Sequence, residues 1–508
     1  MAFGDGEGTG MNLVEVLRTG AAAGGWLDRP AYEVDGAALT HAEVYDGAAR
    51  VAGALVRDGV RVGDRVVVLL DDSPDFVLAF LGAVHAGAVP VAINPRLHRD
   101  ELRQVLDAAR PALVVHRPGD VPPSAAPATT SAGLGGARPV PVVPRDAGDQ
   151  AYATFTSGTT GVPRLCPHAH GDALVHHRSF CVPALRLSPD DVVHSVSKLY
   201  FAYGLGNSLL YPLMSGSRVV LNPEPPVVDD VLAIVDKYDV TALFAVPTFY
   251  ARLIAHPGGE RLANLRLAAA GGEVLLPALE ERLMEVLGDR LLNGIGSTEV
   301  GQAFTHNTPT ARRVGTVGRV LPPFEVRVVD DRGGPVEPDV VGRLQVRGPT
   351  VVLGVDEGGE PRRTRDWYAT GDLASVDADG FVRVTGRLDD VENVGGIKVH
   401  PLEVEHLLAG HPLVREAAVC AAADRDGAAR LRAYVVRAGE PADVRPTDEP
   451  TGEPAGEPTD AELADDLIAL ARRHLTAYKV PREVVFVPSL PRTGSGKLRR
   501  HVVRGWRA

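Results

Sequence analysis

The sequence predicts an α/β protein with a large N-terminal domain and a small α+β C-terminal domain. Three observations carry this prediction: strand and helix patterns alternate from residue 31 to about residue 300, short strands joined by turns follow over 311–386, and a helix followed by strands comes after residue 390. Alternating strands and helices predict a mainly parallel sheet covered by helices, and the short strands predict a small antiparallel β subdomain. With 508 residues, the chain has room for two to four domains of roughly 150 residues each.

The first hundred residues supply repeated β-α units. Thr40 and Glu43 form a capping box that opens an apolar-periodic helix running to Val56. Apolar runs around that helix predict the other elements of this region, which are strands over 31–34, 65–70 and 89–93 and a helix over 75–86.

Composition separates loops from core elements in the rest of the chain. Residues 117–150 are rich in Pro, Ala and Gly, and we expect a surface loop there. Residues 231–246 predict a helix that leads into a strand. Residues 437–460 contain Pro, Glu and Gly with almost no large apolar side chain, so we expect a disordered surface insertion.

Charge and cysteine usage exclude several classes of protein. The 53 Lys and Arg residues stand against 65 Asp and Glu, and the formal net charge of −12 disfavours nucleic acid and anionic membranes as partners. The three widely spaced cysteines suit a reducing compartment, so we expect a cytoplasmic protein. The N-terminus has no signal-peptide pattern, and no apolar run approaches the length of a membrane span, so neither export nor anchoring is expected.

Residues 154–164 (TFTSGTTGVPR) form a candidate phosphate-binding loop. Hydroxyl groups and backbone N–H groups can surround a phosphate, and an arginine adds positive charge. The loop lacks the Gly-Lys-Ser/Thr of a Walker motif, and composition alone would also fit an ordinary turn. The residues of this loop that we expect to surround a phosphate are Thr156, Ser157, Gly158, Thr159, Thr160, Gly161 and Arg164.

The order of this loop resembles TSGTTGxPK, the signature of the adenylate-forming superfamily of acyl-CoA synthetases and adenylation domains, with Arg164 in the lysine position. Five further stretches resemble motifs of that superfamily in the same order: GGE (271–273), NGIGSTEVG (293–301), YATGDLA (368–374), GRLDDVENVGGIKVHPLEVE (386–405) and PRTGSGKLRR (491–500). Six motifs between residues 154 and 500 make coincidence negligible.

The resemblance implies a role for each motif. Asn293 would meet the adenine edge, Thr298 the phosphate and Glu299 a Mg²⁺ ion. Asp372 would take the ribose hydroxyls, with Arg387 near the nucleotide. The remaining ATP-binding positions that the resemblance implies are Gly272, Glu273 and Gly294.

Adenylation brings a carboxylate to the α-phosphate of ATP, and both groups are anions, so cations must face the charge that develops. The resemblance makes Lys497 the catalytic lysine, assisted by Thr298 and Glu299. A solvated surface lysine is the alternative. Because only five of the 53 cationic residues are lysines, a lysine inside this motif argues against that alternative.

Asp389 follows the antiparallel region, and the resemblance makes it the pivot between domains 1–388 and 389–508. A mobile C-terminal domain would bring first Lys497 and then Gly395 and Gly396 to the active site. The two glycines would let the backbone approach a pantetheine arm closely. An ordinary helix-capping linker is the alternative for Asp389.

Residues 198–210 (KLYFAYGLGNSLL) resemble the aryl-acid pocket of benzoate-CoA ligases, although an apolar strand followed by a turn would also fit them. The expected pocket residues are Tyr203, Gly204, Gly272, Gly296, Gln302 and Ala303. Benzoate ligases tend to carry His-Ile where this chain has Gln302 and Ala303. Less bulk and an added amide predict a substituted ring, an amino- or hydroxybenzoate.

A cysteine and several histidines near residue 170 offer an alternative zinc site, although their spacing matches no standard zinc motif. These residues are Cys166, His168, His170, His176 and His177, and we expect His170 to be structural. The glycine-containing stretches at 204–209 and 294–299 lack the third glycine of a dinucleotide fingerprint.

Together these features predict an ATP- and Mg²⁺-dependent ligase that forms an aryl-AMP from an aromatic acid, releases pyrophosphate and then transfers the aryl group to coenzyme A. Three other acceptor reactions stay open: transfer to the pantetheine of a carrier protein, transfer to an amine or hydroxyl nucleophile, and ATP-dependent diazotisation of an aryl amine. A nucleotide-binding regulator without turnover is disfavoured by the combination of Glu299, Asp372 and Lys497. We expect a monomer or a homodimer.

Overall fold

The structure is a computed structural model that describes residues 11–120, 122–124, 126–156, 164–355, 360–394, 397–423, 429–438, 458–492 and 498–506. The chain forms two compact units. One contains residues 1–273, 284–326 and 345–368, and the other contains residues 274–283, 327–344 and 369–508. The predicted division at residues 388 and 389 stays a prediction.

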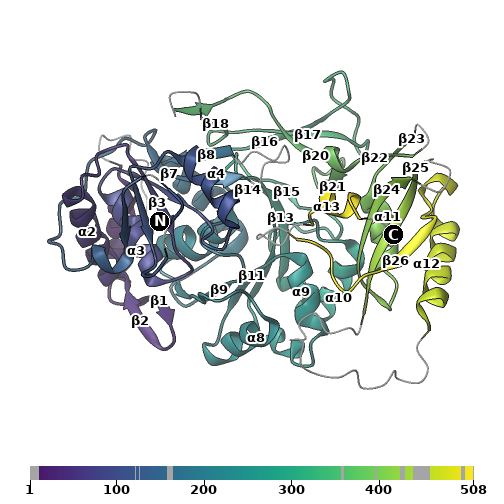
Figure 1. The fold of residues 1–508 in the computed structure, drawn as a ribbon, viewed down its shortest axis with the longest axis horizontal. Coiled ribbons are helices and arrows are strands. Elements are labelled where there is room, and N and C mark those ends of the chain that lie inside the picture. The colour runs from purple at the N-terminus through teal and green to yellow at the C-terminus, as the bar shows by residue number, and fades with distance from the viewer. Residues whose placement is uncertain are drawn as a thin grey trace. The chain divides into compact units, whose positions relative to one another are not determined.

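Two sheets with mainly parallel strands organise the first unit (Figure 1). The six-stranded sheet has the order β6-β5-β3-β4-β7-β8, in which only the β7-β8 pair is antiparallel. Its strands are β3 (Arg65–Leu69), β4 (Val89–Ala92), β5 (Leu113–His116), β6 (Ala128–Thr130), β7 (Gln150–Thr156) and β8 (Arg164–Ala169).

The nine-stranded sheet has the order β15-β14-β13-β12-β11-β9-β10-β1-β2, with parallel pairing from β13 to β1 and antiparallel pairs at both ends. Its strands are β1 (Pro30–Val34), β2 (Ala37–Thr40), β9 (Val192–Ser195), β10 (Arg218–Val220), β11 (Ala242–Ala245), β12 (Leu267–Ala270), β13 (Leu291–Gly296), β14 (Ala303–His306) and β15 (Arg319–Val320).

The later strands form smaller sheets. A four-stranded sheet of the order β16-β17-β20-β21 makes the antiparallel β subdomain, and the second unit also holds a three-stranded sheet of the order β24-β25-β26. The strands of these and of the two-stranded sheets are β16 (Glu325–Val329), β17 (Gly342–Arg347), β18 (Val352–Val355), β19 (Pro361–Arg363), β20 (Tyr368–Val376), β21 (Val382–Arg387), β22 (Glu392–Val394), β23 (Ile397–Val399), β24 (Val414–Ala423), β25 (Ala429–Arg437) and β26 (Glu483–Phe486).

Helices cover these sheets, and none of those in the described part of the chain is long and apolar enough to cross a membrane. The α-helices are α1 (Leu13–Gly24), α2 (His41–Arg57), α3 (Pro74–His85), α4 (Arg99–Ala109), α5 (His170–His176), α6 (Ala202–Leu205), α7 (Tyr211–Ser215), α8 (Val228–Lys237), α9 (Pro247–Ala255), α10 (Pro277–Leu287), α11 (Pro401–Ala409), α12 (Asp460–His474) and α13 (Arg500–Arg504).

The predicted α/β class is confirmed, and α2 begins as its capping box requires. The backbone N–H of Glu43 donates to Thr40 Oγ1 at 3.2 Å, and the backbone N–H of Thr40 donates to Glu43 Oε2 at 2.8 Å. These bonds satisfy donors that a helix N-terminus otherwise leaves unpaired.

Two expectations about local structure need correction. The 117–150 segment is not only a loop, because Ala128–Thr130 pairs with β5 as an edge strand and Leu134 is buried. Backbone pairing with a neighbouring strand can fix so short an element in a segment whose composition favours a loop. The strand-and-turn alternative for 198–210 is wrong, because α6 continues there into a π-helical turn over Gly206–Leu210. Of the predicted insertion at 437–460, residues 439–457 lie outside the described residues.

Candidate active site

The Glu299 turn lies between β13 and β14 in the first unit. The backbone N–H of Val300 donates to Ser297 Oγ at 3.2 Å, and that of Gly301 donates to the carbonyl of Ser297 at 2.9 Å. The carbonyl of Glu299 accepts a bond from the backbone of Val352 at 2.8 Å. The backbone of this turn is therefore fixed while the Glu299 side chain stays partly exposed.

Tyr368, which opens β20, is the neighbour of Glu299 that sequence analysis missed. Burial raises the pKa of the Tyr368 hydroxyl above its ordinary value, and the charge of Glu299 and a hydrogen bond with it raise this pKa further, while Arg164 opposes the rise. The hydroxyl therefore stays protonated and serves as a donor. The only signal in the sequence was the position of Tyr368 at the head of the YATGDLA motif.

Asn293 lies on β13 and is oriented by a second, fully buried asparagine. Asn307 Nδ2 donates to Asn293 Oδ1 at 2.5 Å and to the carbonyl of Thr316 at 2.8 Å. The backbone N–H of Asn307 also donates to the carbonyl of Asn293 at 2.8 Å. This bond occupies Oδ1 of Asn293 and fixes the orientation of its amide, and the expected contact with the adenine edge stays a prediction.

The glycines of this motif pack against β14. A Cβ at Gly294 would lie 2.2 Å from His306 Cδ2, and one at Gly296 would lie 2.7 Å from the carbonyl oxygen of Gln302. Strand packing alone therefore requires glycine at both positions. Their expected roles in binding ATP and substrate stay predictions.

The GGE segment follows β12. Gly272 has a φ of +85°, which favours glycine, and Glu273 Oε2 accepts bonds from the backbone and the hydroxyl of Thr248 at 3.2 and 2.8 Å. The Tyr203 hydroxyl donates to the carbonyl of Ala269 at 3.0 Å, and a Cβ at Gly271 would lie 3.1 Å from the Tyr203 ring. Tyr203 is thus seated beside the segment expected to follow the adenine.

The structure brings Gln302 to the same helix turn as Tyr203. Gln302 Nε2 donates to the carbonyl of Ala202 at 2.6 Å, and a Cβ at Gly206 would lie 2.7 Å from Gln302 Oε1. Ala303 packs beside them against the main core. There is no room for a side chain at Gly204, since a Cβ there would lie 2.1 Å from the carbonyl oxygen of Lys198.

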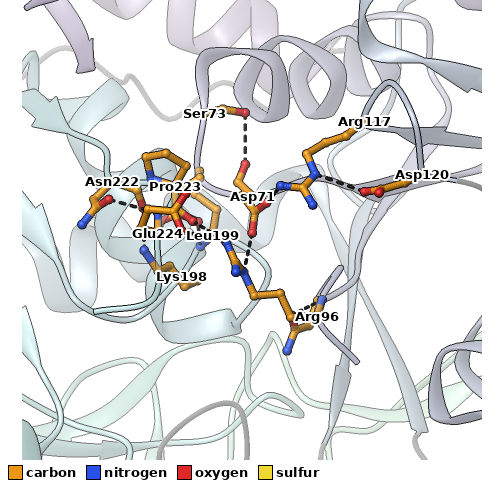
Figure 2. A network of polar contacts seen from close by, with 12 residues as sticks. Asp71, Ser73, Arg96, Arg117, Asp120, Lys198, Leu199, Asn222, Pro223 and Glu224 are labelled. Atoms are coloured by element: carbon orange, nitrogen blue, oxygen red, sulfur yellow. Dashed lines mark hydrogen bonds and ion pairs between the residues drawn. The ribbon is translucent and has the colours of Figure 1, made fainter. Parts of the chain in front are cut away.

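Figure 2 shows a polar cluster around Asp71. Its members follow the carboxyl ends of strands from both large sheets. Asp71 is buried after β3 and pairs with Arg96 after β4 at 3.0 Å and with Arg117 after β5 at 2.8 Å. After β9, Lys198 Nζ donates to the carbonyl of Asn222 at 2.5 Å. A cavity of about 420 Å³ lies beside Asp71 and Arg117.

Asp72, next to this cluster, holds the segment that leads to Tyr203. Its Oδ1 accepts the backbone N–H of Leu199 at 2.8 Å. Burial raises the Asp72 pKa to about 7, against the attraction of Lys198, and the charge of Asp71 adds to the rise. The cluster therefore anchors the start of the proposed aryl pocket.

Asp372 and Arg387 lie side by side in the second unit, paired across β20 and β21. Arg387 Nη1 donates to Asp372 Oδ1 and to the carbonyl of Thr370, both at 3.1 Å. Gly371 has a φ of +79°, and a Cβ there would lie 2.8 Å from Arg387 Nη2. This glycine allows the two expected nucleotide-binding side chains to meet.

Asp389 lies between two anchored segments of the second unit. On the N-terminal side, Arg387 is bound to β20. On the C-terminal side, Arg500 Nε is 3.3 Å from Asp390, and Arg504 Nε donates to Glu392 at 2.7 Å. A rotation about Asp389 would therefore carry residues 390–392 together with α13. This geometry suits a pivot, and the role stays a prediction.

Several predicted site residues lie outside the described residues, namely Ser157, Gly158, Thr159, Thr160, Gly161, Gly395, Gly396 and Lys497. The structure does describe the residues on either side of the phosphate loop. Thr156 and Arg164, on either side of the phosphate loop, are cross-strand partners of β7 and β8. Thr156 Oγ1 is enclosed and has no hydrogen-bond partner within the part of the chain that the structure describes.

The zinc alternative finds no support in the contacts of the histidines. His170 Nδ1 accepts the backbone N–H of Leu13 at 2.9 Å, so its predicted structural role is confirmed. His168 and His176 each contact a backbone carbonyl of the Glu299 turn. Among the described residues, no group of three or more His, Cys, Asp or Glu side chains could hold a metal ion.

Glu299 suits a single-carboxylate Mg²⁺ site. Mg²⁺ is bound through one or two carboxylates together with substrate phosphates and keeps several waters. A partly exposed carboxylate beside the hydroxyl-bearing Thr298, on a fixed turn, is the kind of oxygen donor that such a site needs.

The fold and these motif positions define an adenylate-forming enzyme. Residues 20–355 match the AMP-binding enzyme family, and residues 403–497 match the AMP-binding enzyme C-terminal domain. The chain belongs to this family, and it is an AMP-forming ligase.

Sequence similarity to known relatives extends over almost the whole chain. The chain is 38% identical to the p-hydroxybenzoic acid–AMP ligase FadD22 of Mycobacterium tuberculosis over 97% of its own length and 68% of that protein's. It is 35% identical to the 4-hydroxybenzoate–CoA/benzoate–CoA ligase of Rhodopseudomonas palustris, over 92% and 88% of the two lengths. Among solved structures, the anthranilate CoA ligase AuaEII in complex with anthranoyl-AMP has a TM-score of 0.87 at 28% identity, covering 98% of this chain and 97% of that one.

Proposed function

We propose that this enzyme adenylates a benzoate that carries a hydroxyl or amino group and then transfers the aryl group to the thiol of coenzyme A. The similarity to ligases whose names specify hydroxybenzoate, benzoate and anthranilate supports an aromatic substrate. Similarity of that kind gives the substrate class but does not select a substituent.

The Gln302 amide is the observation that supports the substituent. A carbonyl can only accept a hydrogen bond, so the amide nitrogen must face Ala202, which leaves Oε1 as the acceptor of this side chain. A phenol O–H or an aniline N–H can donate to that oxygen, and an unsubstituted ring cannot. Tyr203 and Ala303 would form the apolar walls around the ring.

The nucleotide would be held by the motif residues described above. Asn293 would donate to the adenine edge, Asp372 would accept the ribose hydroxyls, and Arg387 would lie near the phosphates. Thr298 and Glu299 would hold the phosphates and Mg²⁺. When bound, Mg²⁺ neutralises part of the charge on the phosphate oxygens.

Lys497 would supply the remaining positive charge when the carboxylate attacks the α-phosphate. A unit charge at about 4 Å and an effective dielectric near 20 contributes roughly 4 kcal/mol, which corresponds to about a thousandfold in rate. A pivot at Asp389 would then withdraw Lys497 and bring Gly395 and Gly396 to the pantetheine thiol.

A carrier protein is the second candidate acceptor. The relative at 38% identity is called an acid–AMP ligase, and that name specifies no coenzyme A step. Assays of the second half-reaction with coenzyme A and with a pantetheinylated carrier protein, and identification of the product by mass, distinguish the two acceptors.

Substrate preference tests the role of Gln302. We expect kcat/KM for pyrophosphate release to be higher with 3-hydroxy-, 4-hydroxy- or 2-aminobenzoate than with benzoate. Gln302→Met keeps the length of the side chain and removes the acceptor, so the preference should fall roughly tenfold or more. A wild-type enzyme that clearly prefers benzoate, or a preference that survives in Gln302→Met, would contradict the proposal.

A further inference from the structure

Two buried histidines contact the backbone carbonyls of the residues on either side of Glu299 in the chain. His168 Nε2, on β8, is 2.8 Å from the carbonyl oxygen of Thr298, and His176 Nε2, on α5, is 2.9 Å from that of Val300. Each side chain is only 1% exposed. Because carbonyls only accept hydrogen bonds, both Nε2 atoms must carry a proton and donate.

Gly301 explains how both rings reach the same turn. Its φ is +102°, and a Cβ on it would lie 2.9 Å from His176 Nε2 and 3.2 Å from His168 Cε1. Val300 also receives a bond on its carbonyl from Thr350 Oγ1 at 2.6 Å. The backbone N–H of Val352 donates to the carbonyl of Glu299. Each carbonyl from Thr298 to Val300 therefore accepts a hydrogen bond from a residue outside the turn.

The histidine rings are themselves held in place. His168 Nδ1 is 3.4 Å from Asp172 Oδ2, and Arg363 binds the Asp172 carboxylate through both terminal nitrogens at 2.8 and 3.2 Å. The His176 ring stacks on Phe324 with the ring centroids 5.3 Å apart. Burial lowers the pKa of His176 to about 4, so this ring is a neutral donor at physiological pH.

We propose that His168 and His176 are positioning residues that fix the Thr298–Val300 backbone and thereby direct the Thr298 hydroxyl and the Glu299 carboxylate at the phosphates and Mg²⁺ of bound ATP. The proposal rests on the roles assigned above to Thr298 and Glu299. It predicts that the two histidines affect ATP binding in the presence of Mg²⁺ more than they affect binding of the aryl acid.

Matched amide variants can test this role without emptying the site. A Gln amide nitrogen lies near the position of His Nε2, whereas an Asn amide nitrogen lies near that of Nδ1 and falls short of the carbonyl. The Gln variants at 168 and 176 therefore keep the hydrogen bond to the carbonyl. The Asn variants carry the same amide group but are too short to form that bond. His194→Gln is the control, because His194 is also buried and bonds to a carbonyl, that of Val220, through Nδ1 at 2.9 Å.

The experiment measures the dissociation constant of ATP by calorimetry, with Mg²⁺ and with EDTA, next to the KM of the aryl acid and the thermal unfolding midpoint. We expect His168→Asn and His176→Asn to weaken ATP binding about tenfold with Mg²⁺ and much less with EDTA, with the KM of the aryl acid nearly unchanged. The Gln variants should bind within about threefold of wild type. His194→Gln should change only the midpoint.

Equal ATP affinities in the Asn and Gln variants, or equal losses with Mg²⁺ and with EDTA, would overturn the proposal. Calorimetry needs no turnover, so it tests the histidines even if the wild-type enzyme shows no activity with aryl acids. Wild-type protein that binds ATP but releases no pyrophosphate with any aryl acid would count against the proposed function and leave the binding comparison valid.

Discussion

Asp72 is a carboxylate enclosed by residues of both large sheets. It accepts the backbone N–H of Leu199, its nearest cation is Lys198, and the like charge of Asp71 lies beside it. Burial disfavours the charged form, which raises the Asp72 pKa in the folded protein to about 7, whereas the group ionises near 3.9 in an unfolded chain. A raised carboxyl pKa stabilises the folded state at low pH, and that stabilisation is lost as the pH rises toward 7.

Replacing this carboxylate should therefore change how stability depends on pH. Asp72→Asn keeps an oxygen acceptor for Leu199 and cannot ionise. Between pH 5 and pH 8, the free energy of unfolding of the wild type should fall relative to that of Asp72→Asn by on the order of 2 kcal/mol. Urea unfolding of both proteins at the two pH values measures this difference. A difference that stays constant, or that changes in favour of the wild type, would contradict the account.

Contacts between residues that lie far apart in the sequence could not be predicted from the sequence. His168 meets Thr298, His176 meets Val300, and Asn307 orients Asn293 only after the strands have paired. A histidine in an apolar stretch looks the same whether it binds zinc or a carbonyl. The motif residues themselves could be predicted because their types and order are specific to the chemistry.

At the scale of elements, local signals fixed some boundaries and left others undetermined. The start of α2 was predictable because a capping box is a contact within four residues. The edge strand β6 was not, because pairing with β5 rather than composition creates it. The helical turns over 202–210 were ambiguous because a short apolar run fits a strand equally well.

The linker around Asp389 gives the prediction at this scale. Proline at 389 fixes φ near −65° and restricts Leu388, so rotation between the anchored neighbours Arg387 and Asp390 would be blocked. Asp389→Pro should therefore impair one half-reaction far more than the other. Asp389→Ala, which keeps backbone freedom, should leave their ratio near that of the wild type.

Single-turnover assays measure the two steps separately, with pyrophosphate release for adenylation and thioester formation from preformed aryl-AMP for transfer. Equal losses in both steps of Asp389→Pro, or an unchanged ratio, would argue against a pivot at this residue.

At the scale of the whole molecule, the proposed function requires an acidic chain to place positively charged side chains around a triphosphate. The formal net charge is −12. Arg164 flanks the phosphate loop, Arg387 is held beside Asp372, and Lys497 stands in the C-terminal motif. In the proposed function, binding of the triphosphate therefore depends on local positive charge rather than on the overall charge of the chain.

The central claim is that the enzyme forms an aryl-AMP. Incubation of the full chain with Mg²⁺, ATP and 4-hydroxybenzoate or 2-aminobenzoate, without any thiol, should release pyrophosphate and yield the aryl-adenylate by mass spectrometry. Lys497→Ala should slow its formation about a thousandfold. Formation of ADP and phosphate, release of pyrophosphate that does not depend on an aryl acid, or wild-type rates in Lys497→Ala would contradict the account.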